Sequence, residues 1–159
     1  MEIASEPTSA EAPIRSFLFE GSPGEVARIV EDFCRRLFPS LPESYVQDRI
    51  GFVVKPELFV SEAKGRLVAF KVGYQNSATT FFSWLGGVDE DFRRLGLASR
   101  LAALQHARCR ALGISAIETR TRADNPLMLI VNLRSGFQVV GVEADPYGRF
   151  VVLQRRSLD

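Results

Sequence analysis

The chain has few of the residues that build metal sites and disulfide scaffolds. Its 159 residues include two cysteines, Cys34 and Cys109, and one histidine, His106. Two cysteines exclude a disulfide-rich fold and favour free thiols. One histidine is too few for a multi-histidine metal centre. We therefore expect no metal and a cytoplasmic protein with reduced thiols, in which both cysteines are buried or idle.

Long hydrophobic runs are also missing. The longest apolar runs fall short of the ~20 residues needed to cross a bilayer, and residues 1–6 are acidic and polar, unlike a secretory signal. The composition, 46% hydrophobic and 25% charged, is typical of a globular chain with a core and not of a disordered one. Residues 1–13 are expected to form a flexible tail and residues 14–159 a single domain.

The formal net charge is only +1, but the charges are unevenly distributed. Seven of the seventeen arginines lie between residues 93 and 122, where the only acidic residue is Glu118. Such a stretch fits either an anionic ligand or a solvated helix face. It lacks interleaved aromatic residues and a recognition motif, so we expect no nucleic acid as a partner. A membrane is not expected either.

Hydrophobic periodicity and turn residues predict the element order β-α-α-β-β-β-α-β-α-β-β. A helix begins at Ser22-Pro23-Gly24-Glu25, where Ser22 can cap the first turn. A short helix at 43–50, a long one at 97–112 and a third between Asn125 and Gly136 follow. The long helix is expected to bury Leu97, Leu101, Leu104, Ala107 and Ala111, and to leave His106 at the surface. Phe81, Phe82 and Trp84 are expected in the core.

The most informative segment is a predicted strand-to-helix junction. The strand ends in Gly86-Gly87, a pair that indicates a bulge or a close backbone approach. The chain then reads Val88-Asp89-Glu90-Asp91-Phe92-Arg93-Arg94-Leu95-Gly96-Leu97-Ala98. The first N–H groups of a helix bind phosphate where small residues let the backbone come close. The alternative is a plain junction with exposed arginines; a Walker loop or a dinucleotide fingerprint is excluded by the spacing.

This segment resembles motif A of the GNAT superfamily, the acyl-CoA-dependent N-acetyltransferases, which reads Q/R-x-x-G-x-G/A after a strand with a bulge. The match is in register at Arg93, Gly96 and Ala98. The resemblance implies an α+β, three-layer fold in which helices flank a mixed, mostly antiparallel sheet. It also implies that Val88 pairs with the pantetheine arm, that an amide near Gly86 faces the acetyl carbonyl, and that the pyrophosphate binds the amides of Arg94, Leu95, Gly96, Leu97 and Ala98.

A second segment, from Asn125 to Gly136-Phe137, resembles motif B of the same superfamily. Taken alone, it is a capped helix with Met128 and Val131 in the core. The resemblance implies that Asn125 contacts the cofactor. Many members carry a tyrosine, the proton donor to the leaving thiolate, at the position of Asn132. An amide is no acid near neutral pH, although it hydrogen-bonds sulfur, so Asn132 is either such a donor, which we favour, or polar helix surface.

The sequence does not identify the general base. Phe82 stands where some members carry a glutamate, and Ser83 is a candidate for relaying the proton through water. Other titratable candidates stay open: Glu20, Tyr45, Tyr74, Asp89, Glu90 and Tyr147. Residues 22–50 are expected to form the wall on the acceptor side, with Phe38, Leu41 and Tyr45 as candidates.

The sequence therefore predicts an N-acetyltransferase that uses acetyl-CoA. The acetyl group would pass directly, in a ternary complex, to a primary amine of a small molecule or peptide. The alternative is a non-catalytic acyl-CoA sensor of the same fold. A homodimer stays open as an alternative to a monomer.

Overall fold

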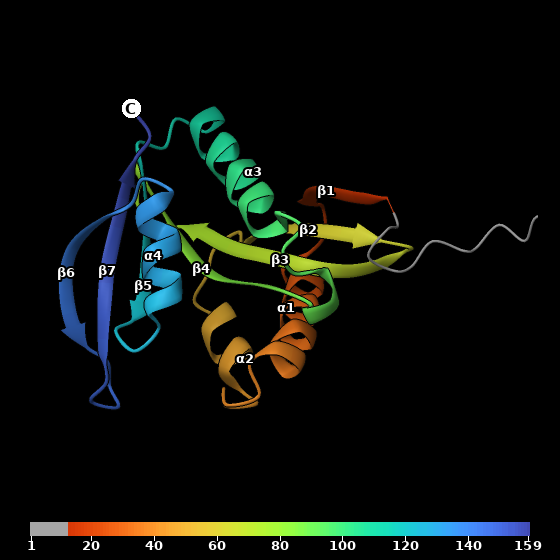
Figure 1. Cartoon of the computed structure of the whole chain (residues 1–159), viewed down its shortest axis with the longest axis horizontal. Helices are drawn as coiled ribbons and strands as arrows, with labels where there is room; N and C mark the ends of the chain where they lie inside the picture. Colours follow the sequence, from red (N-terminus) through yellow and green to blue (C-terminus); the bar gives the residue numbers. More distant parts are fainter. Residues whose placement is uncertain (1–12) are drawn as a thin grey trace, which may run out of the picture. The chain divides into compact units, whose positions relative to one another are not determined.

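The computed structural model describes residues 13–159. The predicted flexible tail, except for its last residue, lies outside the described residues. The elements follow the predicted order, with one added turn of 3-10 helix (Figure 1): β1 Ile14–Phe19, α1 Pro23–Leu37, α2 Tyr45–Ile50, β2 Glu57–Ala63, β3 Arg66–Gln75, β4 Thr80–Val88, η1 Glu90–Phe92, α3 Leu97–Ala111, β5 Ala116–Arg122, α4 Pro126–Arg134, β6 Gln138–Ala144 and β7 Phe150–Ser157.

The strands form one mixed sheet in the order β1-β2-β3-β4-β5-β7-β6. Three neighbouring pairs, β1–β2, β5–β7 and β7–β6, are antiparallel. The pair β4–β5 is parallel, and its register runs only from Thr80↔Ala116 to Ser83↔Thr119, whereas β4 continues to Val88. The predicted mixed, mostly antiparallel sheet with flanking helices is confirmed.

The chain divides into two compact units, each with its own buried core. Unit 1 comprises residues up to Val72 together with Leu85–Gln105, and unit 2 comprises Gly73–Trp84 and His106–Asp159. A buried cluster of unit 1 joins Phe59, Ala63, Val68, Ala69, Phe92, Leu97 and Leu101. That of unit 2 joins Phe81, Cys109, Ile114, Ile117 and Phe137. The prediction of a single domain stays a prediction.

Helix α1 begins where its sequence predicts. The hydroxyl of Ser22 accepts a hydrogen bond from the N–H of Glu25 at 3.2 Å, and Pro23 occupies the first turn. The apolar stripe of the helix buries Val26, Val30 and Phe33. Among the described helices, none is long and apolar enough to cross a membrane.

The buried face of α3 differs from the predicted one in its second half. Leu97 and Leu101 are buried and Leu104 is partly buried, but Ala107 and Ala111 are exposed. The face instead buries Gln105, His106 and Cys109. The expectation of a surface His106 is wrong: the Arg156 guanidinium lies 2.8 Å from Nδ1, and the ring centroid of Phe137 lies 6.0 Å away. Arg156 and Phe137 are distant from His106 in the sequence, so the periodicity of α3 alone does not predict that His106 is buried.

Helix α4 also differs from expectation. Met128 and Val131 were expected in the core, but they are 42% and 49% exposed, and no residue of α4 is buried. The sequence Pro-Leu-Met-Leu-Ile-Val-Asn-Leu-Arg is apolar around most of the helix circumference. Its periodicity therefore does not select one face as the buried one.

Candidate functional site

The loop after η1 is held between two anchored residues. Phe92 and Leu97 are 4% and 3% exposed in the core of unit 1, whereas residues 93–96 between them are exposed. Arg94 and Gly96 have left-handed backbone angles, φ 65° and 75°. Left-handed residues in such a turn bring successive N–H groups to one side and make an anion-binding concavity. The two φ values are compatible with the anion-binding loop expected here.

The start of α3 adds to this preference for an anion. The carbonyl of Gly96 accepts the N–H of Arg100 at 3.0 Å, so the N–H groups of Leu97, Ala98 and Ser99 precede the first bond within the helix. These groups lie at the positive end of the helix dipole. The first turn contains no acidic residue that would neutralise it. Ala98 is exposed and small, so it leaves room beside these amides.

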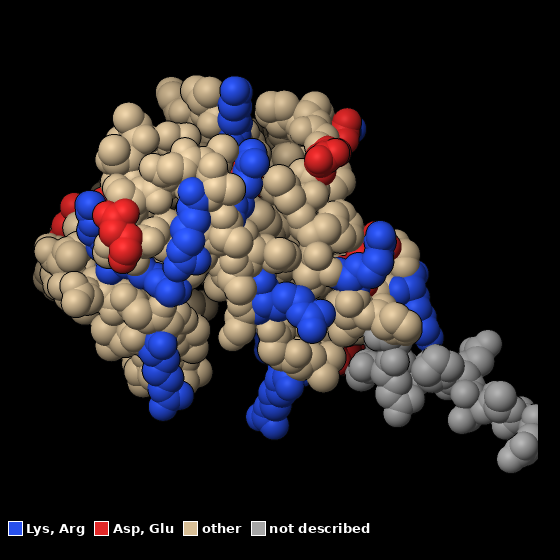
Figure 2. Space-filling model, turned by 90° about the horizontal axis from the view of Figure 1, so that it is seen from above, with Lys and Arg blue, Asp and Glu red and all other residues tan. Residues whose placement is uncertain are grey.

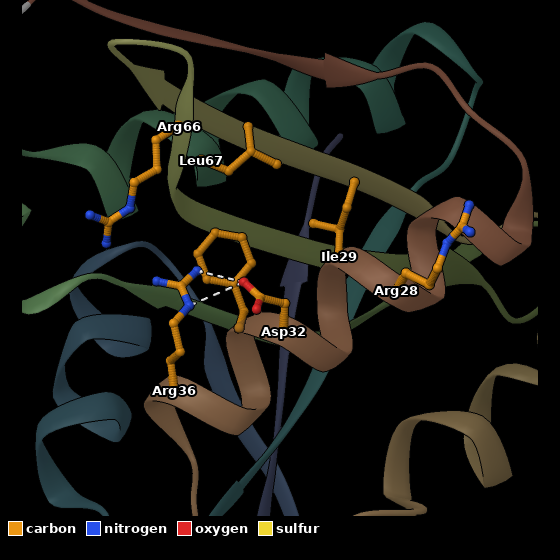
Figure 3. A pocket seen from close by; sticks show the side chains of 7 residues that line it. Arg28, Ile29, Asp32, Arg36, Arg66 and Leu67 are labelled. Carbon is orange, nitrogen blue, oxygen red and sulfur yellow. Dashed lines mark hydrogen bonds and ion pairs between the residues drawn. The ribbon is translucent and has the colours of Figure 1, made fainter.

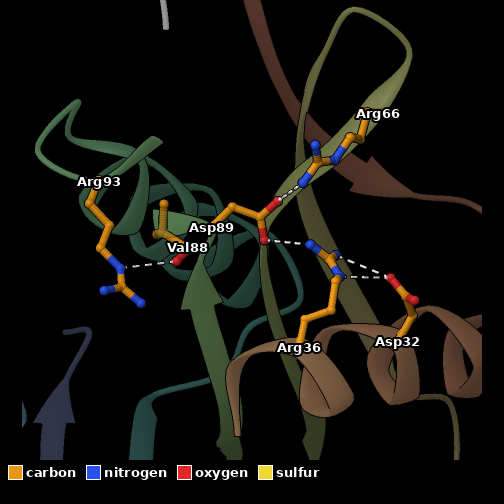
Figure 4. Close-up of polar contacts among 6 residues, drawn as sticks. All are labelled: Asp32, Arg36, Arg66, Val88, Asp89 and Arg93. Carbon is orange, nitrogen blue, oxygen red and sulfur yellow. Dashed lines mark hydrogen bonds and ion pairs between the residues drawn. The ribbon is translucent and has the colours of Figure 1, made fainter. Parts of the chain in front are cut away.

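Arg93 is attached to the end of β4. Its Nε donates a hydrogen bond to the carbonyl of Val88 at 3.2 Å (Figure 4). The bond holds the guanidinium at the strand end and occupies one lone pair of the carbonyl expected to face the pantetheine arm. The second lone pair stays available.

The Gly86-Gly87 pair lies where the chain approaches its neighbours closely, as predicted. A Cβ on Gly86 would lie 3.2 Å from the carbonyl oxygen of Phe70, and one on Gly87 would lie 2.8 Å from Cδ1 of Leu37. A side chain at Gly87 therefore requires the Leu37 side chain to shift. The glycines let this end of β4 lie against β3 and α1, while the expected bulge stays a prediction.

Lys71 lies beside Gly86, and sequence reasoning missed it. Its Cγ would be 3.6 Å from a Cβ on Gly86. The side chain is partly buried, and within the described residues it makes no hydrogen bond or ion pair. Burial lowers its pKa to about 8, so a sizeable fraction of this amine is neutral near pH 7.5. The available signal was a lysine between Phe70 and Val72, within the otherwise apolar run of residues 67–73.

Asp89, one of the open candidates for the base, is instead ion-paired. Oδ1 accepts from Arg36 at 2.6 Å and Oδ2 from Arg66 at 2.8 Å (Figure 4). Since both oxygens bind guanidinium groups, Asp89 is poorly placed to take a proton from an amine. Among the other candidates, Glu90 and Tyr147 are exposed, and Tyr74 packs its ring against Phe82 and Trp84.

Unit 2 contains the remaining predicted site residues. Asn125 caps α4, as expected, by accepting the N–H of Met128 at 3.3 Å. Asn132 is partly buried, and its Nδ2 donates to Gln154 at 2.9 Å and to Thr121 at 3.4 Å. A sulfur atom reaches an Asn132 proton only by displacing one of these partners. Ser83 is 5% exposed, and its carbonyl accepts from the hydroxyl of Thr119 at 3.1 Å.

A cavity of about 500 Å³ lies between α1 and α2 in unit 1. Its volume falls in the range of small-molecule sites. Phe38, Leu41 and Tyr45, the candidates for the acceptor side, all line it. Two acidic residues, Glu31 and Glu43, and one basic residue, Arg35, also line it, so the excess of negative charge would favour a cationic amine.

Cys34 also lines this cavity, and its surroundings favour the protonated thiol. Burial, with a further contribution from Glu31, raises the pKa of its thiol to about 11. The thiol therefore stays protonated near neutral pH, and the thiolate is the nucleophilic form. Cys109 is fully buried. Both cysteines are buried and free, as predicted.

A second cavity of unit 1, of about 530 Å³, lies between α1 and the start of β3. Figure 3 shows its lining side chains, which come from these two elements: Arg28, Ile29, Asp32, Phe33, Arg36, Arg66 and Leu67. Two of its arginines are the partners of Asp89.

Basic side chains prevail on the face shown in Figure 2, where neutral side chains separate most of them. Within residues 13–159, no three His, Cys, Asp or Glu side chains gather as they would around a metal ion.

The mixed sheet, with a helix that begins in a left-handed loop after β4, defines an acyl-CoA acyltransferase fold. Residues 21–125 match the family described as "Acetyltransferase (GNAT) domain". This match covers more than half of the chain, so the protein belongs to the GNAT acetyltransferase family. The matched range contains the whole of motif A and reaches only the first residue of motif B, Asn125.

Three solved structures illustrate the similarity in fold. One is a GNAT family acetyltransferase from Elizabethkingia anophelis with acetyl-CoA bound (13% identity, TM-score 0.74, 91% of this chain and 97% of that one). Another is the ribosomal-protein-S18-alanine N-acetyltransferase from Escherichia coli (14%, 0.73, 91% and 95%). The third is Ard1 from Thermoplasma volcanium (22%, 0.71, 89% and 97%). No curated protein matches the chain.

Proposed function

We propose that the protein is an N-acetyltransferase that transfers an acetyl group from acetyl-CoA to a primary amine of a small molecule or peptide. The observation that carries the proposal is the exposed loop of left-handed residues between Phe92 and Leu97 at the start of α3. Its backbone conformation, the absence of acid in the first turn of α3 and membership of the GNAT family all support binding of a CoA diphosphate.

In this proposal, the amides of residues 94–98 hold the diphosphate and the backbone of Val88 aligns the pantetheine arm. Holding the thioester still can supply several kcal/mol of the barrier, because a bimolecular step becomes effectively unimolecular. The amide near Gly86 stabilises the developing oxyanion, a contribution often of ~3 kcal/mol. Asn125 contacts the cofactor, Asn132 faces the leaving sulfur, and Ser83 relays a proton through water.

Direct transfer is favoured over an acetyl-enzyme intermediate. Cys34 lines the cavity between α1 and α2, but its raised pKa keeps the thiol protonated. We propose that this cavity admits the acceptor amine, since its acidic residues Glu31 and Glu43 outnumber its one basic residue, Arg35. Phe38 and Tyr45 offer apolar contact. A cytoplasmic location is part of the proposal, because the two free thiols suit a reducing compartment.

The experiment that tests the cofactor site compares two glycines of the same backbone conformation. Gly96 has φ 75° and Gly148 has φ 77°, and a Cβ on either would contact no other residue within 4 Å. Valine at either position therefore causes similar backbone strain, of roughly 1–2 kcal/mol. We expect Gly96→Val to weaken acetyl-CoA binding at least tenfold in calorimetry, because the altered loop no longer directs its amides at the diphosphate.

Gly148→Val is the matched control, and it should lose stability without losing acetyl-CoA affinity. Equal affinity in the two variants would place the diphosphate elsewhere. Absence of binding to the wild-type protein would refute the proposed cofactor altogether. Release of free CoA thiol, followed with a panel of primary amines, then tests the transfer itself.

A sensor that binds acyl-CoA without transferring the group is the second candidate. It is favoured by one observation: both Nδ2 protons of Asn132 are directed at Gln154 and Thr121. Tight binding of acetyl-CoA with no thiol release across a broad amine panel would support the sensor and contradict the transferase.

A further inference from the structure

Asp89 lies between the end of β4 and the loop that we assign to the cofactor. It follows Val88, the last residue of β4, and precedes η1. Its N–H donates to the carbonyl of Val68 at 2.8 Å, and its own carbonyl accepts from Phe92 at 2.9 Å. The backbone of Asp89 is therefore bonded on one side to β3 and on the other to the residue that anchors the loop.

The side chain of Asp89 is bound from two further directions. Arg36 reaches it from α1 and Arg66 from the start of β3 (Figure 4). Arg36 is itself held by Asp32 at 3.1 Å, and its guanidinium lies 4.7 Å from the ring centroid of Phe33. The carboxylate thus connects the end of β4 to two elements that lie far from it in the sequence.

Because Asp89 is buried, its carboxylate depends on these two ion pairs. Asp89 is 5% exposed, and a buried carboxylate is tolerated only where it is paired and hydrogen-bonded. If the carboxylate stayed buried without the two guanidinium groups, the cost of its desolvation would no longer be offset. By contrast, the ion pair of Arg15 with Glu62 is largely exposed and contributes little to rigidity.

We propose that Asp89, through Arg36 and Arg66, is a positioning residue that fixes Val88 and the loop 93–98 for the diphosphate of acetyl-CoA. This inference rests on the proposed function. It explains why an acidic residue, Asp89, precedes the loop assigned to the diphosphate, although a negative charge there repels an anion. The benefit is a loop whose amides are already aligned before the ligand arrives.

The variant Asp89→Asn separates the two effects of this carboxylate because they have opposite signs. Removing its charge leaves Arg66 without this acidic partner and Arg36 paired with Asp32 alone, so by Coulomb attraction alone a diphosphate would bind more tightly. Losing the two ion pairs releases the end of β4, so the positioning role predicts weaker binding. A role in stability alone predicts unchanged affinity in the folded variant.

We would measure acetyl-CoA affinity by calorimetry for the wild type, Asp89→Asn and the control Glu62→Gln, which removes the exposed ion pair on β2. We expect at least a tenfold weaker Kd for Asp89→Asn and less than a twofold change for Glu62→Gln. Unchanged or tighter binding by Asp89→Asn would overturn the proposal. Absence of binding by the wild type would instead refute the proposed function.

A second readout compares kcat/KM for two thioesters. One is acetyl-CoA, and the other is S-acetyl-N-acetylcysteamine, which lacks the diphosphate. We expect kcat/KM of Asp89→Asn to fall at least tenfold with acetyl-CoA, mainly through KM, and by a clearly smaller factor with the truncated thioester, which keeps part of the arm that Val88 aligns but makes none of the contacts with the diphosphate. An equal fall with both thioesters would mean general damage to the protein and would overturn the positioning role.

Arg66 provides a variant that folds even where Asp89→Asn does not, because its side chain is 66% exposed. Arg66→Met should weaken acetyl-CoA binding about threefold, and Arg66→Lys should restore much of the affinity because an ammonium still pairs with Oδ2. An unchanged Kd in Arg66→Met, or equal losses in both variants, would contradict the proposal.

Discussion

At the scale of single residues, the partly buried Lys71 lowers the stability of the folded state. Its aliphatic stem lies against Gly86, while its partly buried amine lacks a carboxylate or carbonyl partner among the described residues. Desolvation lowers its pKa from the ordinary 10.5 to about 8. Each unit of such a shift corresponds to about 1.4 kcal/mol, so the charged form costs the folded state at most about 3.5 kcal/mol near pH 7.

We predict that Lys71→Met stabilises the protein at pH 7 by about 1–3 kcal/mol, because it removes this desolvation cost. Between pH 8 and 10.5 the unfolded chain binds more protons at Lys71 than the folded one, so wild-type stability rises with pH there. The advantage of Lys71→Met should therefore shrink across this range. Urea denaturation at pH 7 and pH 10 measures the difference in the free energy of unfolding between Lys71→Met and the wild type.

Lys55→Met is the control, since Lys55 is exposed, and it should change stability little at either pH. A destabilised Lys71→Met, or an advantage that is the same at both pH values, would show that Lys71 is not held in a desolvated site.

At the scale of elements, local chemistry explains the helix ends better than the helix faces. Ser22 and Asn125 cap α1 and α4 as their sequences predict, because a cap depends on residues only three positions apart. The buried face of α3 was predicted correctly at Leu97 and Leu101 but not at Gln105 and His106. A polar residue is buried only where distant elements surround it, and periodicity does not report them.

The cap of α1 gives a prediction at this scale. Ser22→Ala removes the hydrogen bond to the N–H of Glu25 and should lower the free energy of unfolding by about 1 kcal/mol. Ser40→Ala serves as the control because Ser40 is exposed and, within the described chain, its side chain makes no hydrogen bond. Equal stability of the two variants in urea would show that the cap contributes nothing.

At the scale of the whole molecule, charge distribution distinguishes an acyltransferase from a nucleic-acid binder. The net charge is +1, and neutral side chains separate most of the cations on the face in Figure 2. Several arginines are also engaged by acids, as Arg122 is by Asp124 and Arg155 by Glu118. Binding of a polyanion requires many cations aligned along one path.

We therefore predict that a mixed-sequence RNA binds with a Kd weaker than about 10 μM at 150 mM salt, and that raising salt from 50 to 200 mM removes what binding exists. Filter binding over a salt series measures it, with acetyl-CoA as the positive ligand. Micromolar or tighter binding that persists at 200 mM salt would overturn this prediction.

The sequence by itself determined the order of the elements, the capped helix starts and the motif A loop with Gly96. Each of these depends on residues within a few positions of one another. Only the tertiary structure decided that β7 lies between β5 and β6, that His106 is buried, that Lys71 loses its hydration, and that Asp89 meets Arg36 and Arg66. These depend on how distant elements pack, which local periodicity does not encode.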